Sequence, residues 1–161
     1  AKDTLPYRWE TGTLNHEGIA GTTAAIDYLA HLAPPPHRSR RAALAATWQL
    51  LTAYERQLSE HLIRGLLALP GLTFYGIREP ERFAQRTPTV AFRLAQASPR
   101  QIAEHLAQHG IFTWDGNYYA LSLTERLDVE QSGGMLRVGL VHYNTHEEID
   151  ALLYALRQLT G

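Results

Sequence analysis

The segment from Gly133 to Ile149 constrains the fold more than any other, because it encodes a strand, a tight bend and a helix start in succession. Three alternating apolar residues share one face of this strand and are predicted to point toward a core: Leu136, Val138 and Leu140. Thr145 and Glu148 have the spacing of a capping box, which satisfies free backbone N–H groups where a helix begins. The helix that follows carries apolar residues at helical spacing: Ile149, Leu152, Leu153, Leu156 and Leu159.

Arg137 is the one residue of this strand that a core does not explain. Alternation places it on the opposite face from Leu136, with Gly139 two positions along on its own side. The missing side chain at Gly139 leaves room for a ligand to lie against the backbone. An arginine in a strand more often pairs with a carboxylate of the protein than with a ligand, so the residues alone leave both interpretations open.

The composition is that of an ordinary globular protein and excludes several kinds of partner. The 161 residues correspond to one domain, or to a small domain with an appendage, and 45% of them are hydrophobic. A formal net charge of -1 gives no electrostatic reason to expect nucleic acid or an anionic membrane as a partner. No run of residues approaches the roughly 18 apolar residues of a membrane span. The first residues contain neither an initiator Met nor the apolar core of a signal peptide, so we expect a cytoplasmic protein and a chain taken from a longer one.

The counts of two residue types limit the chemistry of the chain. It has no cysteine, which excludes disulfides, thiolate nucleophiles, persulfide carriers and cysteine-ligated zinc. Its basic residues are fourteen arginines and a single lysine, Lys2. Histidines at 105 and 109 have the spacing of a two-histidine metal face, but no third ligand is placed to complete a site, and we expect no metal.

Periodicity predicts two long helices followed by an α+β arrangement. A first helix runs from about Ile19 and ends before Pro34, and Ser39 caps a second that reaches about Leu69. Strands are predicted over residues 72–75, 89–94 and 111–114, with loops or turns over 76–86 and 115–117. Ser98 starts a further helix that Gly110 closes, and residues 118–127 suit a short helix. The fold class is therefore α+β: a small, mostly antiparallel sheet covered by helices and preceded by long N-terminal helices.

A turn ahead of the first helix is a weak candidate for a phosphate site. Gly12 lies between Thr11 and Thr13, and such a turn can offer hydroxyl and backbone N–H donors to a phosphate. Most turns of this kind are only helix caps, and the pattern alone does not decide.

Two motifs together resemble the class V aminotransferases, in their cysteine desulfurase-like branch. Arg137-Val138-Gly139, followed by Tyr143-Asn144-Thr145-x-Glu-Glu-Ile-Asp, is similar to the C-terminal signature of that family. Trp9-Glu10-Thr11-Gly12-Thr13-Leu14-Asn15 resembles the family's Glu-x-Gly-Thr-x-Asn segment. The motifs occur in the family's order and with a similar separation, so the resemblance covers essentially the whole chain.

The resemblance implies the C-terminal part of a pyridoxal-phosphate enzyme of fold type I, built as a homodimer with its active site at the interface. It implies that Thr13, beside Gly12, contacts the phosphate of the partner subunit's pyridoxal 5'-phosphate, and that Arg137 holds the α-carboxylate of an amino-acid substrate. Residues 1–38 would then be an interface segment and the first helix, from the larger domain. Residues 39–161 would be the C-terminal α+β small domain, led by a long connecting helix.

Three departures from the family pattern limit the expected activity. The family's Schiff-base lysine should lie well upstream of the Gly-Thr segment, but Lys2 is only eleven positions before Thr13, so we assign no catalytic residue and expect the chain alone to be inactive. Where desulfurases carry a Gly-x-His-Cys loop, this chain has residues 116–119, Gly-Asn-Tyr-Tyr, and without cysteine we do not expect persulfide-type desulfurase activity. Desulfurases also carry an arginine shortly before that loop, and this chain has Trp114 at the corresponding position.

The alternative function is that of a non-catalytic α+β module for dimerisation or small-molecule binding, with Arg137 in a structural ion pair.

Overall fold

The computed structural model describes residues 3–10 and 12–160, so Lys2 and Thr11 lie outside the described residues. The chain forms two compact units, Ala1–Leu51 and Thr52–Gly161. The division falls inside the long helix α2 (Arg40–Leu67). The domain boundary that the sequence suggests after residue 38 stays a prediction.

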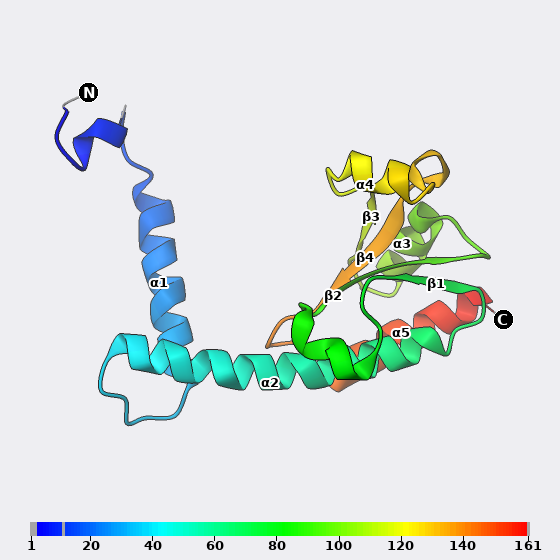
Figure 1. Ribbon diagram of the computed structural model, residues 1–161, viewed down its shortest axis with the longest axis horizontal. Coiled ribbons are helices and arrows are strands. Elements are labelled where there is room, and N and C mark those ends of the chain that lie inside the picture. Colours follow the sequence, from blue (N-terminus) through cyan, green and yellow to red (C-terminus); the bar gives the residue numbers. More distant parts are fainter. Residues whose placement is uncertain (1–2, 11, 161) are drawn as a thin grey trace. The chain divides into compact units, whose positions relative to one another are not determined.

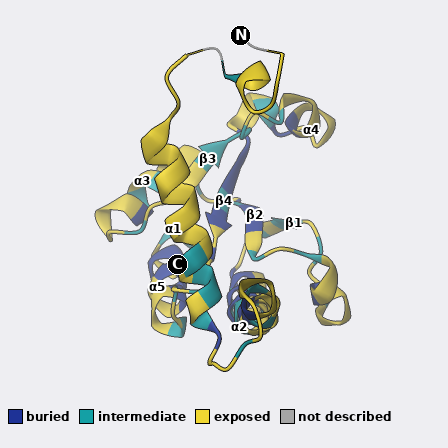
Figure 2. Cartoon of the chain, turned by 90° about the vertical axis from the view of Figure 1, so that its left-hand side faces the viewer, coloured by how far each residue is buried: buried dark blue, intermediate teal, exposed yellow. Residues whose placement is uncertain are grey.

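The first unit contains a short 3-10 helix (Tyr7–Trp9), helix α1 (His16–Leu32) and the start of α2. The predicted cap is present at α2, where Ser39 Oγ accepts a hydrogen bond of 3.2 Å from the Ala42 N–H. At α1 the cap is Asn15, which was not predicted and accepts a hydrogen bond of 2.8 Å from the Gly18 N–H. The buried hydroxyl of Thr47 donates to the Leu29 carbonyl at 2.7 Å and so ties α2 to the end of α1. No residue of α1 is buried, and Figure 2 shows its surface exposed along most of its length.

The second unit is built on a four-stranded antiparallel sheet, as the sequence predicts (Figure 1). Its strands are β1 (Leu72–Tyr75), β2 (Thr89–Leu94), β3 (Trp114–Gly116) and β4 (Met135–Gly139), in the order β1-β2-β4-β3. The other helices of this unit are α3 (Pro99–Gln108), α4 (Leu121–Arg126) and α5 (His146–Thr160). The α+β fold class is therefore confirmed.

One core joins a single face of this sheet to helices α2, α3 and α5. Strand alternation places its sheet residues as predicted, and its largest fully buried members are Leu58, Leu62, Ile63, Leu66, Val90, Phe92, Ile102, Leu106, Leu136, Ile149 and Leu156. The predicted capping box of Thr145 and Glu148 is present, and the predicted helix start at Ser98 also has the form of a capping box. Ser98 and Gln101 bond each other's backbone at the start of α3, and Thr145 and Glu148 do the same at the start of α5.

The predicted positions of the third strand and its turn are wrong. Residues 111–113 form no strand, because the Ile111 N–H donates to the Leu106 carbonyl at 3.0 Å and belongs to the C-terminal cap of α3. The strand begins instead at Trp114, and Gly116, expected in a turn, is its last residue. The region expected as a loop over 76–86 contains a 3-10 helix (Pro80–Gln85) that buries Phe83. A second such turn (Glu130–Ser132) precedes β4.

Within the described residues, no helix combines the length and apolar character needed to cross a membrane.

Candidate functional site

Arg137 lies in the middle of β4, on the face of the sheet that the core helices do not cover. Its cross-strand partners are Ala91 of β2 and Trp114 of β3. Its neighbours along the strand, Leu136 and Val138, are buried on the opposite face. Residues directly opposite one another in an antiparallel pair share a face, so the side chain of Trp114 lies beside that of Arg137.

Two aromatic rings surround the Arg137 guanidinium. Its Cζ lies over the Trp114 ring at 5.3 Å from the ring centroid, and over the Tyr118 ring at 4.8 Å. Both distances are within the range of cation–π attraction. Within residues 3–10 and 12–160, the guanidinium makes no hydrogen bond or ion pair. Its N–H donors are therefore available to a ligand.

Two other arginines near the same sheet show the contrasting arrangement. Arg93, on the same face of β2, donates to the backbone carbonyls of Ser132, at 3.3 Å, and Gly134. Arg86 donates to three backbone carbonyls, including that of Thr89 at 2.7 Å. These guanidinium groups hold loops in place, whereas that of Arg137 does not.

An open hollow of about 560 Å³ lies in front of Arg137. Its walls are Thr89, Phe112, Thr113, Trp114, Arg137 and Gly139, and Arg137 is its one charged residue. A Cβ atom built on Gly139 would meet nothing closer than Thr89 Oγ1, at 3.7 Å. The side of Arg137 toward Gly139 is therefore clear, as the sequence suggests. A planar anion such as a carboxylate matches the guanidinium fork.

Tyr118 belongs to the loop that joins β3 to α4, and its contact with Arg137 was not predicted. Its hydroxyl donates a hydrogen bond to the Met135 carbonyl of β4. Its backbone has a φ of 55°, and that of Tyr119 has a φ of 62°, a conformation that non-glycine residues rarely adopt. The sequence signal at these residues favours a short helix, so the left-handed turn and the contact it creates could be found only in three dimensions.

The pKa of Tyr118 lies well above the ordinary value for a tyrosine. Burial of the phenol is the main cause, and the negative charge of Asp115 adds to it. The Arg137 guanidinium acts in the opposite direction but does not reverse the shift. Tyr118 therefore stays neutral at physiological pH, and its hydroxyl can donate a hydrogen bond to the Met135 carbonyl.

Gly12 and Thr13 lie in the first unit, in the turn before α1. Both are exposed, and a Cβ atom on Gly12 would have nothing within 4 Å. Asn15, not Thr13, caps α1. The Thr13 hydroxyl has no hydrogen-bond partner in the described part of the chain. The chemistry of this donor set fits a phosphate group.

The histidine pair of α3 has structural contacts of its own. His105 Nε2 lies 3.0 Å from the Ala155 carbonyl, and His109 Nδ1 lies 3.0 Å from the His105 carbonyl. Among the residues that the structure describes, no group of three or more His, Cys, Asp or Glu side chains could hold a metal ion.

A family model gives these features a context. The model described as aminotransferase class-V matches residues 1–152 of the chain. The chain belongs to this family. The match includes Gly12 and Thr13 and the whole of β4, so all three candidate residues lie inside the family's sequence pattern.

Similar class-V sequences include cysteine desulfurases, and they are much longer than this chain. An uncharacterised protein of Mycobacterium tuberculosis is 32% identical over 156 residues, which cover 97% of this chain and 37% of that protein. A cysteine desulfurase of Klebsiella pneumoniae is 31% identical over 154 residues, which cover 96% of this chain and 32% of the enzyme. This class-V chain thus spans about a third of the length of these curated relatives.

Solved structures agree on the fold of this class-V chain. The cysteine desulfurase CsdA of Escherichia coli aligns with a TM-score of 0.76 and 25% identity, over 99% of this chain and 34% of its own. The apo cysteine desulfurase of Thermococcus onnurineus NA1 aligns with a TM-score of 0.77 at 24% identity, over 96% of this chain and 34% of its own, and supports the fold alone. The prediction of a C-terminal part of a class-V fold is confirmed.

Proposed function

We propose that this chain is the C-terminal part of a pyridoxal-phosphate enzyme that acts on an amino acid, and that Arg137 binds the α-carboxylate of the substrate. One observation carries the proposal. The Arg137 guanidinium, on the strand that bears the family signature, faces an open hollow and forms no hydrogen bond with the described residues. Family membership supports an amino-acid substrate, because relatives are named cysteine desulfurases.

The role of Arg137 follows from its geometry. A guanidinium presents two parallel N–H groups to the two oxygens of a carboxylate, and this charge-assisted pairing is stronger than a neutral hydrogen bond. The rings of Trp114 and Tyr118 leave these donors unused. Arg137 therefore orients the substrate by its carboxylate, whatever the rest of the amino acid is.

Gly12 and Thr13 are proposed to hold the cofactor phosphate of the partner subunit in a homodimer. An exposed hydroxyl and a glycine backbone that a phosphate can approach closely support this role. The exposed apolar side chains of α1, such as Ile19 and Ile26, support self-association of this segment. Pyridoxal phosphate, when bound, supplies the electron sink for chemistry at the substrate's α-carbon.

The chain does not provide the remaining catalytic groups. Its one lysine, Lys2, lacks the sequence context of a cofactor-binding lysine, and the chain has no cysteine to carry sulfur. We therefore propose that the isolated chain is inactive and that the full-length protein does not form a persulfide on this part of its sequence.

The test uses the full-length protein loaded with pyridoxal phosphate, titrated with L-alanine and with L-alaninamide, which lacks the carboxylate. Arg137→Lys should weaken L-alanine binding by about 1.5–3 kcal/mol, the scale of hydrogen bonds to charged groups, and leave L-alaninamide binding unchanged. Arg93→Lys is the matched control, because Arg93 holds backbone carbonyls on the same face. It should lower Tm without changing either Kd.

The alternative function, a non-catalytic module, gives the opposite result. If Arg137 stabilises only the fold or a dimer, Arg137→Lys lowers Tm and leaves the Kd of L-alanine unaltered. That outcome would end the proposal of a substrate carboxylate site.

A further inference from the structure

Arg137 contacts two aromatic rings and, within the described residues, donates to no acceptor. Arg86 and Arg93 donate to backbone carbonyls, and Arg86 does so although it also lies over the Phe74 ring, at 5.6 Å. A ring face attracts a cation through its quadrupole and has no oxygen or nitrogen lone pair to accept the strong hydrogen bonds of the N–H groups. The two rings beside Arg137 therefore restrict the guanidinium while keeping its N–H groups free.

Tyr118 is fixed on the side of its hydroxyl and on the side of its backbone. The hydroxyl donates to the carbonyl of Met135, two residues before Arg137 on the same strand. The Asn117 side chain accepts from the Tyr119 N–H at 3.1 Å and donates to Glu130 at 3.1 Å, which holds the loop. The ring is thus anchored to the strand whose arginine it contacts.

Trp114 is fixed by the sheet. It is the first residue of β3 and is in register with Arg137, so the indole and the guanidinium are neighbours on one face. Trp114 is open to solvent, with 54% of the residue exposed. The tryptophan therefore borders the hollow as well as contacting the arginine.

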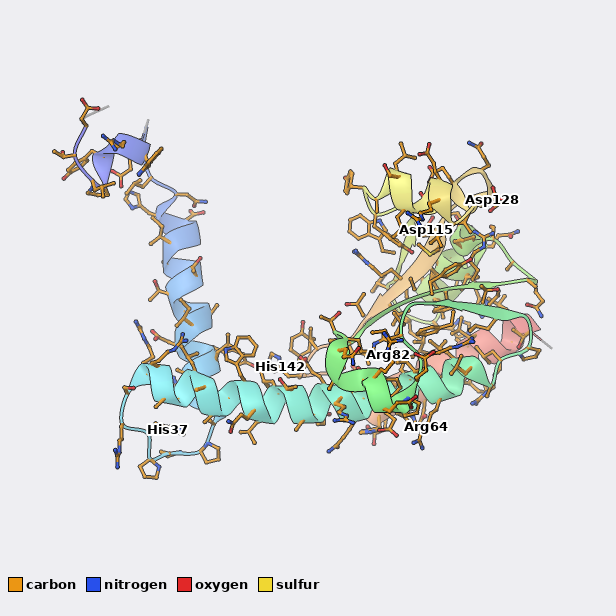
Figure 3. All side chains as sticks on the ribbon, in the orientation of Figure 1. His37, Arg64, Arg82, Asp115, Asp128 and His142 are labelled. Atoms are coloured by element: carbon orange, nitrogen blue, oxygen red, sulfur yellow. The ribbon has the colours of Figure 1, made fainter. Side chains whose placement is uncertain are left out.

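The carboxylate of β3, Asp115, forms no ion pair with Arg137 within the described residues. Asp115 (Figure 3) is in register with Leu136, on the core face of the sheet. Its Oδ1 lies 3.6 Å from Arg100 Nη1 of α3. Because side chains alternate along β3, Trp114 contacts Arg137 on one face of the sheet and Asp115 pairs with Arg100 on the other.

We propose that Tyr118 and Trp114 are positioning residues. Their rings hold the Arg137 guanidinium by cation–π contacts, so that its paired N–H donors stay directed to a substrate carboxylate. The inference rests on the proposed function of Arg137 and adds to it the two side chains that prepare the site. Lysine cannot use this arrangement, because its ammonium has no plane to orient.

The experiment compares ring removal with ring retention in the full-length protein loaded with pyridoxal phosphate. Tyr118→Leu and Trp114→Leu should each raise the Kd of L-alanine by about 2–5-fold, the range of an exposed cation–π contact, and leave that of L-alaninamide unchanged. Tyr118→Phe and Trp114→Phe keep a ring and should restore most of the L-alanine affinity. Tm is measured for each variant. Because Trp114 is exposed, Trp114→Leu and Trp114→Phe should change the stability of the fold less than the two Tyr118 variants do.

The outcomes separate this inference from the proposed function. If the leucine variants bind L-alanine like wild type, or lose L-alanine and L-alaninamide binding equally, the positioning role is wrong. If that happens while Arg137→Lys still weakens L-alanine binding, the carboxylate site remains. If Arg137→Lys has no effect, both proposals fail.

Discussion

Gly65 of α2 and Leu153 of α5 pack so closely that a Cβ atom on Gly65 would lie 2.2 Å from Leu153 Cδ1. Leu153 is buried in the core, so its side chain cannot move aside freely. Gly65→Ala should overpack this contact and destabilise the protein by about 1–3 kcal/mol, measured by urea unfolding. Gly139→Ala is the control, because its Cβ would have ordinary contacts only. An unfolding midpoint equal to wild type for Gly65→Ala would show that the helices can separate without cost.

The two glycines that precede β4 should differ in their tolerance of a side chain. Both have a positive φ, 89° at Gly133 and 70° at Gly134, so alanine costs about 1–2 kcal/mol at either. A Cβ on Gly134 would also lie 2.2 Å from the Gly116 carbonyl oxygen, whereas one on Gly133 meets only Pro99, at 3.8 Å. Gly134→Ala should therefore lower Tm clearly more than Gly133→Ala. Equal losses would contradict the close approach of the two backbones.

Sequence reasoning succeeded where the deciding signal is local. The capping residues Ser39, Ser98 and Thr145 each start a helix as predicted, and strict alternation over 89–94 gives β2 its observed bounds. The outward direction of Arg137 also follows from alternation. The prediction from the sequence is wrong at β3, because that edge strand has only three residues and the cap of α3 uses the backbone just before it.

The surroundings of Arg137 could not be predicted, because they depend on register and on a rare backbone conformation. The pairing of Trp114 with Arg137 joins residues that no local pattern connects. Tyr118 reaches the guanidinium through a left-handed loop that the sequence does not signal. The roles of Gly12, Thr13 and Arg137 in binding stay predictions.

The capping box of α5 should make stability depend on acid pH. The Glu148 carboxylate accepts hydrogen bonds from the Asn144 side chain and the Thr145 N–H, both at 3.0 Å, and these hold its pKa below the ordinary value of 4.5. A lowered folded-state pKa adds stability above the unfolded value, and that stability is lost as the pH falls through the folded value.

Glu148→Gln removes this contribution. Its Tm deficit relative to wild type should be present at about pH 7 and shrink toward about pH 3. Glu125→Gln is the control, because Glu125 is exposed and its side chain makes no hydrogen bond or ion pair within the described residues. A deficit that is constant over this range would show that the carboxylate charge has no part in the cap.

Gly139 keeps clear the space beside Arg137 on the outward face of β4. Gly139→Val adds a β-branched side chain to the outward face of β4, where the hollow lies. Valine favours strands and the position is exposed. Tm should therefore stay the same or rise, and the free energy of unfolding should increase by no more than about 1 kcal/mol. In the full-length protein loaded with pyridoxal phosphate, the Kd of L-alanine should nevertheless increase, since the branched side chain occupies space that the substrate backbone needs next to the guanidinium. Gly139→Ala adds a single methyl group, whose nearest neighbour would be Thr89 Oγ1 at 3.7 Å, and should give a smaller increase. A valine variant that binds L-alanine as tightly as wild type would show that the substrate approaches Arg137 from another side.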